Sequence, residues 1–279
     1  MNSELSQRLF VATNCFLDVR LSIDMFYHHF RPPKGEALHT NFWLALILII
    51  VLVAMTIRPS LAQDVSEEAD STVADHMHEH LTRISTIKSA IVAGKLENVR
   101  EAATWLADHE TAADLRTEFE SYIILMRSHA GHVIEAEDLA CAAESVSEMA
   151  KTCGNCHLVN DVKPQFSYDR RPREDLEDVV THMQRHQWAT DRLWEGLIGP
   201  SDSAWNRGAD MLIDAPLLPS DVTSATDNAA EIARIARRIH ALGGIGTETK
   251  TPDARSELYA ELLGLCASCH TLLGRGPAN

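Results

Sequence analysis

A helical period of apolar side chains begins soon after residue 70. Its first members recur at steps of mostly three or four residues: Leu81, Ile84, Ile87, Ile91 and Val92. This spacing predicts an amphipathic helix over residues 71–93, ended by Gly94. Three more helices are expected over residues 96–109, over 117–136, and from 138 to the region of residue 157.

The same plan follows once more after a stretch rich in Pro and Arg. The expected helices cover residues 173–197, 204–213, 220–242 and 252–273. A glycine-rich segment at 243–247 is expected to form the loop between the last two. Sustained alternation of period two is absent from the sequence, so we predict an all-α protein of two tandem four-helix bundles.

Sequence repeats support a tandem duplication of one unit. The segment HMHEH at 76–80 returns as HMQRH at 182–186, an offset of 182 − 76 = 106 residues. Farther on, RSHA at 127–130 resembles RIHA at 238–241, at an offset of 238 − 127 = 111 residues. The offset grows between matching helices, as small loop insertions would make it.

These patterns divide the chain into four parts. Residues 1–62 are expected to form a cytoplasmic tail followed by a signal peptide or a membrane anchor. The first bundle then covers residues 66–163, a linker covers 164–172, and the second bundle covers 173–279.

An uncharged apolar run lies at residues 42–57, with basic residues before it and an acidic stretch after Arg58. This charge bias predicts that everything after about residue 60 is exported, which places the bundles in the periplasm of a bacterium. The run is shorter than the ~20 residues of a typical spanning helix. It is therefore either a signal peptide cleaved near Ala62 or an anchor in the inner membrane.

Composition narrows the possible partners. The chain is 45% hydrophobic and 23% charged, as in globular proteins, and its net charge of −15 argues against binding nucleic acid, which calls for a basic face. An acidic surface suits a basic redox protein as partner.

Two Cys-x-x-Cys-His segments, at 153–157 and 266–270, carry the clearest chemistry. In a c-type cytochrome the two thiols attach to the haem vinyl groups as thioethers, and the adjacent histidine binds the iron from the proximal side. We therefore expect two covalent haem c groups, held by thioethers and by proximal histidines. The thioether residues are Cys153, Cys156, Cys266 and Cys269, and the proximal histidines are His157 and His270.

The motif at the end of the last helix resembles the cytochrome c-prime group, the class II cytochromes c. Met77-x-x-His80 and Met183-x-x-His186 are similar to a Met-x-x-His segment on the first helix of that group. The resemblance spans each unit from about residue 71 onward. Neither motif is followed by the aromatic-Arg pair that is frequent in the group, which leaves the distal side of the haem open to interpretation.

His80 and His186 are our candidates for the distal iron ligands, because both copies of the unit retain them. Arg127 and Arg238 are candidate partners for haem propionates, since a guanidinium matches a carboxylate. Cys141 is expected to be a small buried residue. The alternatives at the distal position are Met77, Met183, His76 and His182, or an open five-coordinate iron.

The leading functional hypothesis is a periplasmic di-haem cytochrome that carries electrons between redox partners and is not an enzyme. The alternatives are a haem protein that binds or senses NO or CO at a five-coordinate iron, and a di-haem oxidoreductase. The two units are expected to pack on each other as an internal pseudo-dimer, or two chains to form a homodimer.

Overall fold

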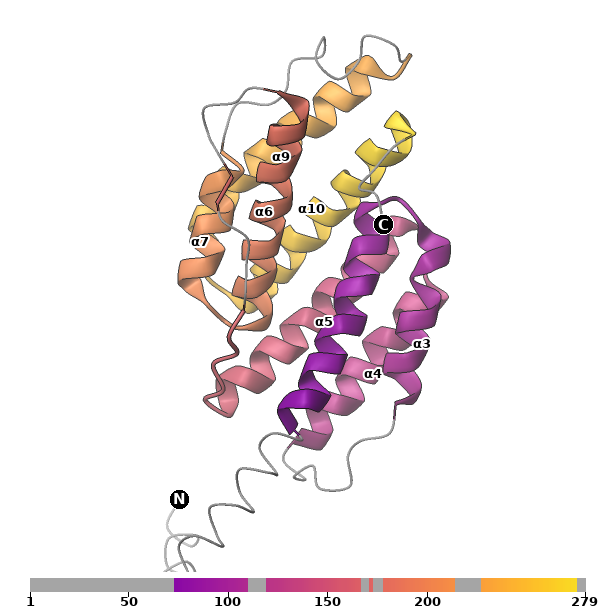
Figure 1. Cartoon of the computed structure of the whole chain (residues 1–279), viewed down its shortest axis with the longest axis vertical. Coiled ribbons are helices and arrows are strands. Elements are labelled where there is room, and N and C mark those ends of the chain that lie inside the picture. The colour runs from indigo at the N-terminus through magenta and orange to yellow at the C-terminus, as the bar shows by residue number, and fades with distance from the viewer. Residues whose placement is uncertain (1–72, 110–118, 167–170, 173–177, 214–226, 275–279) are drawn as a thin grey trace, which may run out of the picture. The chain divides into compact units, whose positions relative to one another are not determined.

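The computed structural model of the protein describes residues 73–109, 119–166, 171–172, 178–213 and 227–274. Every regular element within these ranges is a helix, which confirms the prediction of an all-α protein (Figure 1). No helix in this part of the chain is both long and apolar enough to cross a membrane. The predicted signal peptide or anchor at residues 42–57 lies outside the described residues.

The first half begins with a helix over residues 73–92, which carries the apolar period noted above. Gly94, two residues after this helix, has a left-handed backbone conformation with φ of 74°. Asp138 caps α5 by accepting a hydrogen bond from the Cys141 backbone N–H at 2.8 Å. The remaining elements are η1 (Leu96–Asn98), α3 (Arg100–Asp108), α4 (Glu120–Glu135) and α5 (Leu139–Val159).

The second half repeats the helical plan with strong end signals. Asp178, Ser201 and Thr251 cap three of its helices through their side-chain oxygens, and Pro252 occupies the first turn of the last one. Gly274 ends that helix in the left-handed conformation. The four helices are α6 (Val179–Ile198), α7 (Asp202–Met211), α9 (Ala229–Glu248) and α10 (Pro252–Leu273).

The predicted loop at 243–247 is wrong, because α9 continues through it to Glu248. Two of its glycines, Gly243 and Gly246, serve close helix packing instead of a turn. A Cβ on Gly243 would lie 2.8 Å from the Ala209 carbonyl oxygen of α7, and Gly246 accepts a hydrogen bond at 2.9 Å from the indole N–H of the buried Trp205. The packing against α7 thus outweighs the low helix propensity of glycine.

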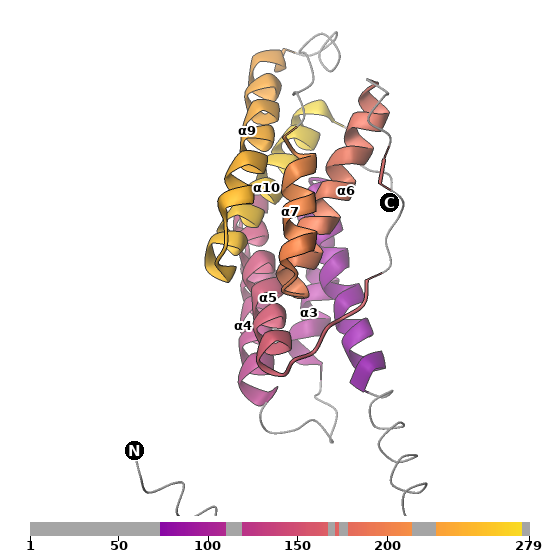
Figure 2. The ribbon, with the colours of Figure 1, turned by 90° about the vertical axis from the view of Figure 1, so that its left-hand side faces the viewer.

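The two halves pack against each other within one compact unit that spans residues 69–279. α5 lies along α10 and also contacts α6 (Figure 2), and buried side chains of both halves form one hydrophobic cluster. Polar links cross the same boundary. Lys88, almost fully buried, pairs with Asp191 at 2.6 Å, and Ser256 donates to Glu148 at 2.8 Å.

Candidate functional site

The two Cys-x-x-Cys-His segments lie close to the C-terminal ends of α5 and α10. All four cysteines of the segments are free thiols. Burial raises the pKa of the Cys153 and Cys266 thiols to about 12, and it also raises the pKa of Cys156 and Cys269. The thiols are therefore protonated at neutral pH, unlike the low-pKa cysteines of disulfide oxidoreductases.

The motif histidines bond to the opposite halves of the molecule. His157 Nδ1 lies 2.8 Å from the Ile198 carbonyl oxygen, and His270 Nδ1 lies 2.6 Å from the Val92 carbonyl oxygen. A carbonyl only accepts, so each Nδ1 is the donor in this bond, which leaves Nε2 as the ring nitrogen available to a metal. The carbonyls are 198 − 92 = 106 residues apart, which is the offset of the sequence repeat between the first helices.

Two glycines allow these crossed approaches. A Cβ on Gly154 would overlap the Leu197 carbonyl oxygen, so α5 meets the end of α6 backbone to backbone. A Cβ on Gly94 would lie 2.7 Å from Thr271 Oγ1, at the end of α10. The end of each first helix is thereby held against the Cys-x-x-Cys-His segment of the other half.

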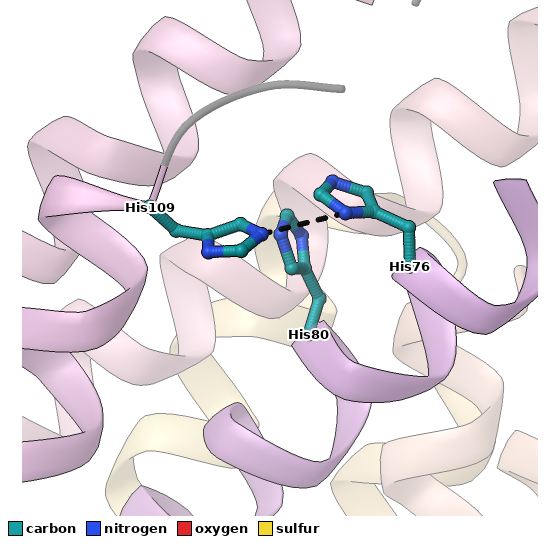
Figure 3. Close-up of side chains that lie close together, drawn as sticks. All are labelled: His76, His80 and His109. Atoms are coloured by element: carbon teal, nitrogen blue, oxygen red, sulfur yellow. Dashed lines mark hydrogen bonds between the residues drawn. The ribbon is translucent and has the colours of Figure 1, made fainter. Parts of the chain in front are cut away.

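A cluster of three histidines, the first histidine cluster, lies in the first half (Figure 3). His76 and His80 come from the helix over residues 73–92, and His109 directly follows α3. His109 Nε2 is 3.4 Å from His76 Nδ1, and one ring nitrogen of each of the three residues lies within 4.8 Å of the other two. The three imidazoles thus converge on one small volume.

Neighbouring groups orient this cluster. The Trp105 indole stacks on the His109 ring at 3.8 Å between centroids, and Arg127 donates a hydrogen bond to the His109 carbonyl oxygen. Burial, followed by the positive charges of His76, His109 and Arg127, lowers the pKa of His80 to about 4. His80 is therefore neutral at pH 7, as a metal ligand must be.

A second histidine cluster occupies the second half. His182 and His186 project from α6 and His240 from α9, and His186 Nε2 lies 3.3 Å from His240 Nε2. Burial is the largest cause that holds the pKa of His186 well below its usual value, followed by the charges of His182, His240, Arg185 and His270. The motif histidine His270 is thus within electrostatic reach of this cluster.

Helix direction brings each cluster to the same end of its half as the motif. Successive helices alternate in direction (Figure 1), so the start of the first helix, the end of α3 and the end of α5 lie at the same end of the first half. The start of α6 and the end of α10 are related in the same way in the second half. Each half therefore combines a Cys-x-x-Cys-His segment and three histidines at one end.

The other candidate residues have the following positions. Met77 and Met183 are half-buried neighbours of the clusters in sequence. Arg127 contacts the first cluster, whereas the exposed Arg238 forms a two-pronged salt bridge with Glu261 at 2.5 and 2.7 Å. The prediction for Cys141 is wrong, because this residue is exposed in the first turn of α5, beside its cap.

The sequence repeat did not indicate the third member of either cluster correctly. It paired His129 with His240, but His129 lies near His132, with ring centroids 6.0 Å apart, in a cavity of about 340 Å³ lined also by Glu135, Glu144 and Glu148. The repeat offers no counterpart of His109, because Ala215 and Ser220 stand at the offsets of 106 and 111 residues. The only signal for His109 in the sequence is Trp105, one helical turn earlier, on which it stacks.

Comparisons with known proteins gave no significant match, whether to protein-family models, to curated proteins or to solved structures.

Proposed function

We propose that the protein is a di-haem c-type cytochrome that carries electrons between redox partners outside the cytoplasm. Haem c is attached at Cys153 and Cys156 and at Cys266 and Cys269. His157 and His270 are the proximal ligands. When bound, the haem iron supplies one-electron redox chemistry at a potential that the protein sets through ligands, hydrogen bonds and burial.

The observation that carries the proposal is the matched geometry of the two motif histidines. Each donates Nδ1–H to a backbone carbonyl, at 2.8 Å for His157 and 2.6 Å for His270. Such a bond fixes the tautomer and the ring orientation of a metal-binding histidine and raises its basicity. The same bond in two copies of the motif supports a shared role as axial ligands.

The cysteines also fit a thioether attachment. In each motif the two thiols are three residues apart near a helix end, unpaired and protonated at neutral pH. Because burial raises their pKa, they are poor candidates for thiol–disulfide exchange, which needs an accessible thiolate. Covalent haem attachment gives both pairs a role that leaves no reactive thiol.

The finer fold belongs to the same proposal: two tandem four-helix bundles joined as an internal pseudo-dimer. The packing of α5 on α10 and the crossed bonds from His157 to Ile198 and from His270 to Val92 support it. In this arrangement each half orients the proximal ligand of the other. The two redox centres would then respond together to changes at the boundary between the halves.

The acidic chain, with a net charge of −15, is suited to transient contact with a basic redox protein. Export through residues 42–57, with cleavage near Ala62 or retention as an anchor, stays a prediction. It agrees with haem c attachment, which takes place outside the bacterial cytoplasm.

The distal ligand stays a prediction as well. His186 is favoured in the second half, because its cluster lies within electrostatic reach of His270. A reduced protein whose absorption spectrum ignores CO would have two six-coordinate irons, as expected for a carrier. A Soret shift with CO on either haem would favour the gas-binding alternative.

Covalent haem content of paired cysteine variants tests the proposal. We expect two haems per chain in the matured protein by the pyridine haemochrome assay. One haem should remain after Cys153→Ala with Cys156→Ala, and one after Cys266→Ala with Cys269→Ala. Cys141→Ala is the matched control and keeps both. A wild-type chain without covalent haem, matured beside a cytochrome c that is loaded normally, would contradict the proposal.

A further inference from the structure

We propose that His76, His80 and His109 together bind one divalent transition-metal ion, such as Zn²⁺, at a site separate from both Cys-x-x-Cys-His segments. This inference goes beyond the electron-carrier function and does not depend on it. The site is the first histidine cluster, shown in Figure 3.

The spacing of the ring nitrogens fits a shared ion. Two imidazole nitrogens that bind zinc at about 2.05 Å with a tetrahedral angle lie about 3.3 Å apart. His109 Nε2 and His76 Nδ1 are 3.4 Å apart, and the corresponding nitrogen of His80 lies within 4.8 Å of both. The three nitrogens are therefore close enough to bind one ion if the His80 side chain adjusts toward the other two.

An unsatisfied nitrogen of His80 provides an independent observation. The Nε2 atom of His80 is buried and has no hydrogen-bond partner among the residues that the structure describes. A buried ring nitrogen without a partner costs free energy, and a bound metal ion would recover it. Imidazole is a preferred ligand for zinc, copper and nickel.

The surroundings of the cluster are those of a prepared site. Trp105 holds the His109 ring by stacking at 3.8 Å, while Arg127 fixes the His109 backbone and not a ring nitrogen. Glu79 lies within electrostatic reach of His76 and offsets part of the positive charge. Such outer contacts orient metal-binding histidines and raise their affinity.

The second histidine cluster differs in one decisive contact. There the Arg185 guanidinium lies 3.4 Å from His182 Nδ1, so a fixed positive charge points at a ring nitrogen. A guanidinium only donates and never loses its charge, so it competes with a cation for that nitrogen. This difference assigns the ion to the first cluster.

A single His80 nitrogen cannot bind both this ion and a haem iron. The metal site therefore replaces the earlier prediction of His80, and of its alternative His76, as a distal haem ligand and leaves Met77 in the first half, whereas the prediction for His186 is unaffected. The experiment has to separate these two roles of His80.

The test uses the full-length matured protein, stripped of loosely bound metal with a chelator and titrated with Zn²⁺ by calorimetry. We expect one tight equivalent per chain. His109→Ala and His76→Ala should weaken binding by at least about 100-fold, the upper end of the loss seen for outer-shell partners. His78→Ala, exposed on the same helix, is the matched control and should bind like wild type.

Far-UV circular dichroism and haem content of the same samples verify that each variant is folded and loaded. Equal Zn²⁺ affinity in His109→Ala and His78→Ala would overturn the proposal, as would loss of the ion in His240→Gln instead. His80→Ala should lose Zn²⁺ and keep the haem spectrum. A new high-spin band in this variant would make His80 an iron ligand and overturn the metal site. If the matured wild-type chain bound Zn²⁺ but carried no haem, that result would contradict the cytochrome function and leave the metal site standing.

Discussion

In both halves a three-histidine cluster takes two members from matching positions on the first helix. The third member comes from a helix that does not correspond between the halves. In the first half the third ring is His109, at the end of α3, whereas in the second half it is His240, in the middle of α9. The first cluster rests on Trp105 and is half-buried, while His182 and His240 of the second are almost fully buried beside Arg185. Duplicated helices thus keep a histidine triad without keeping its sequence positions.

The difference in burial is consistent with the two proposals. A half-buried cluster admits an ion from solvent, as the proposed metal site requires. The second cluster, in which His182 and His240 are buried, lies within electrostatic reach of His270, as a distal ligand of the proposed second haem would. The crossed bonds of His157 and His270, in contrast, are the same in both halves.

The two tryptophans Trp205 and Trp105 should differ most in how much they contribute to the free energy of unfolding. Trp205 is fully buried and donates to the Gly246 carbonyl at 2.9 Å, so Trp205→Ala should lower the free energy of unfolding by about 3–5 kcal/mol. Trp105→Ala should cost less, because Trp105 is half-buried, but should weaken Zn²⁺ binding. Denaturant titration of both variants makes the comparison. Equal losses of stability would contradict the assigned difference in packing.

Gly154→Ala tests whether the two motifs differ in how closely they pack against the other half. The second half has Ala267 at the matching position, so the change copies a natural motif, yet the added Cβ would meet the Leu197 carbonyl oxygen. We expect a loss of about 1–3 kcal/mol, as for other overpacked sites. Gly264→Ala, with open space around its Cβ, is the control and should be neutral or stabilising. Unfolding curves that match for both variants would show that α5 and α6 do not meet at Gly154.

Acid should lower the free energy of unfolding because His80 takes up a proton on unfolding. The folded protein holds the pKa of His80 at about 4, and its unfolded value is 6.5. The unfolded state therefore binds more protons between these values, so stability is constant above about pH 6.5 and falls as the pH drops toward 4. We expect a loss of about 1–2 kcal/mol after allowance for partial exposure. In metal-stripped protein, this acid-induced loss of stability should be smaller in His80→Gln than in wild type. In His78→Gln it should equal the wild-type loss.

The smallest effect concerns the exposed pair of Arg238 and Glu261. Although the contact is two-pronged, at 2.5 and 2.7 Å, solvent screening limits an exposed ion pair to about 0–1 kcal/mol. Arg238→Ala should therefore change the unfolding midpoint little and leave haem binding intact. Loss of one haem in this variant would instead support the predicted contact of Arg238 with a propionate.

The helices were predictable because their apolar periods and end caps are local properties of the sequence. The first helix was expected over residues 71–93 and covers 73–92, and α10 has the predicted bounds, with Thr251 as cap and Gly274 at its end. The error at 243–247 has a tertiary cause. The glycines of α9 are read locally as a turn, but their lack of side chains lets α9 approach α7.

The candidate site was predictable only where one short motif contains it. The thiols and the histidines of each motif are adjacent in sequence, whereas the Ile198 and Val92 carbonyls lie 198 − 157 = 41 and 270 − 92 = 178 residues away. Every residue has a backbone carbonyl, so no residue type in the sequence indicates which carbonyl accepts the hydrogen bond. His109 was missed because the two histidines with which it clusters are on another helix, and the sequence repeat matches His240 with His129 instead.

The intact mass of the matured protein shows whether haem is covalently attached. Denaturation removes non-covalent groups before the measurement, so only thioether-bound haem remains. We expect the mass of the mature polypeptide plus two haem groups, with one attached to the peptide that contains residues 153–157 and one to the peptide that contains 266–270. A bare polypeptide from cells that load another cytochrome c normally would contradict this expectation.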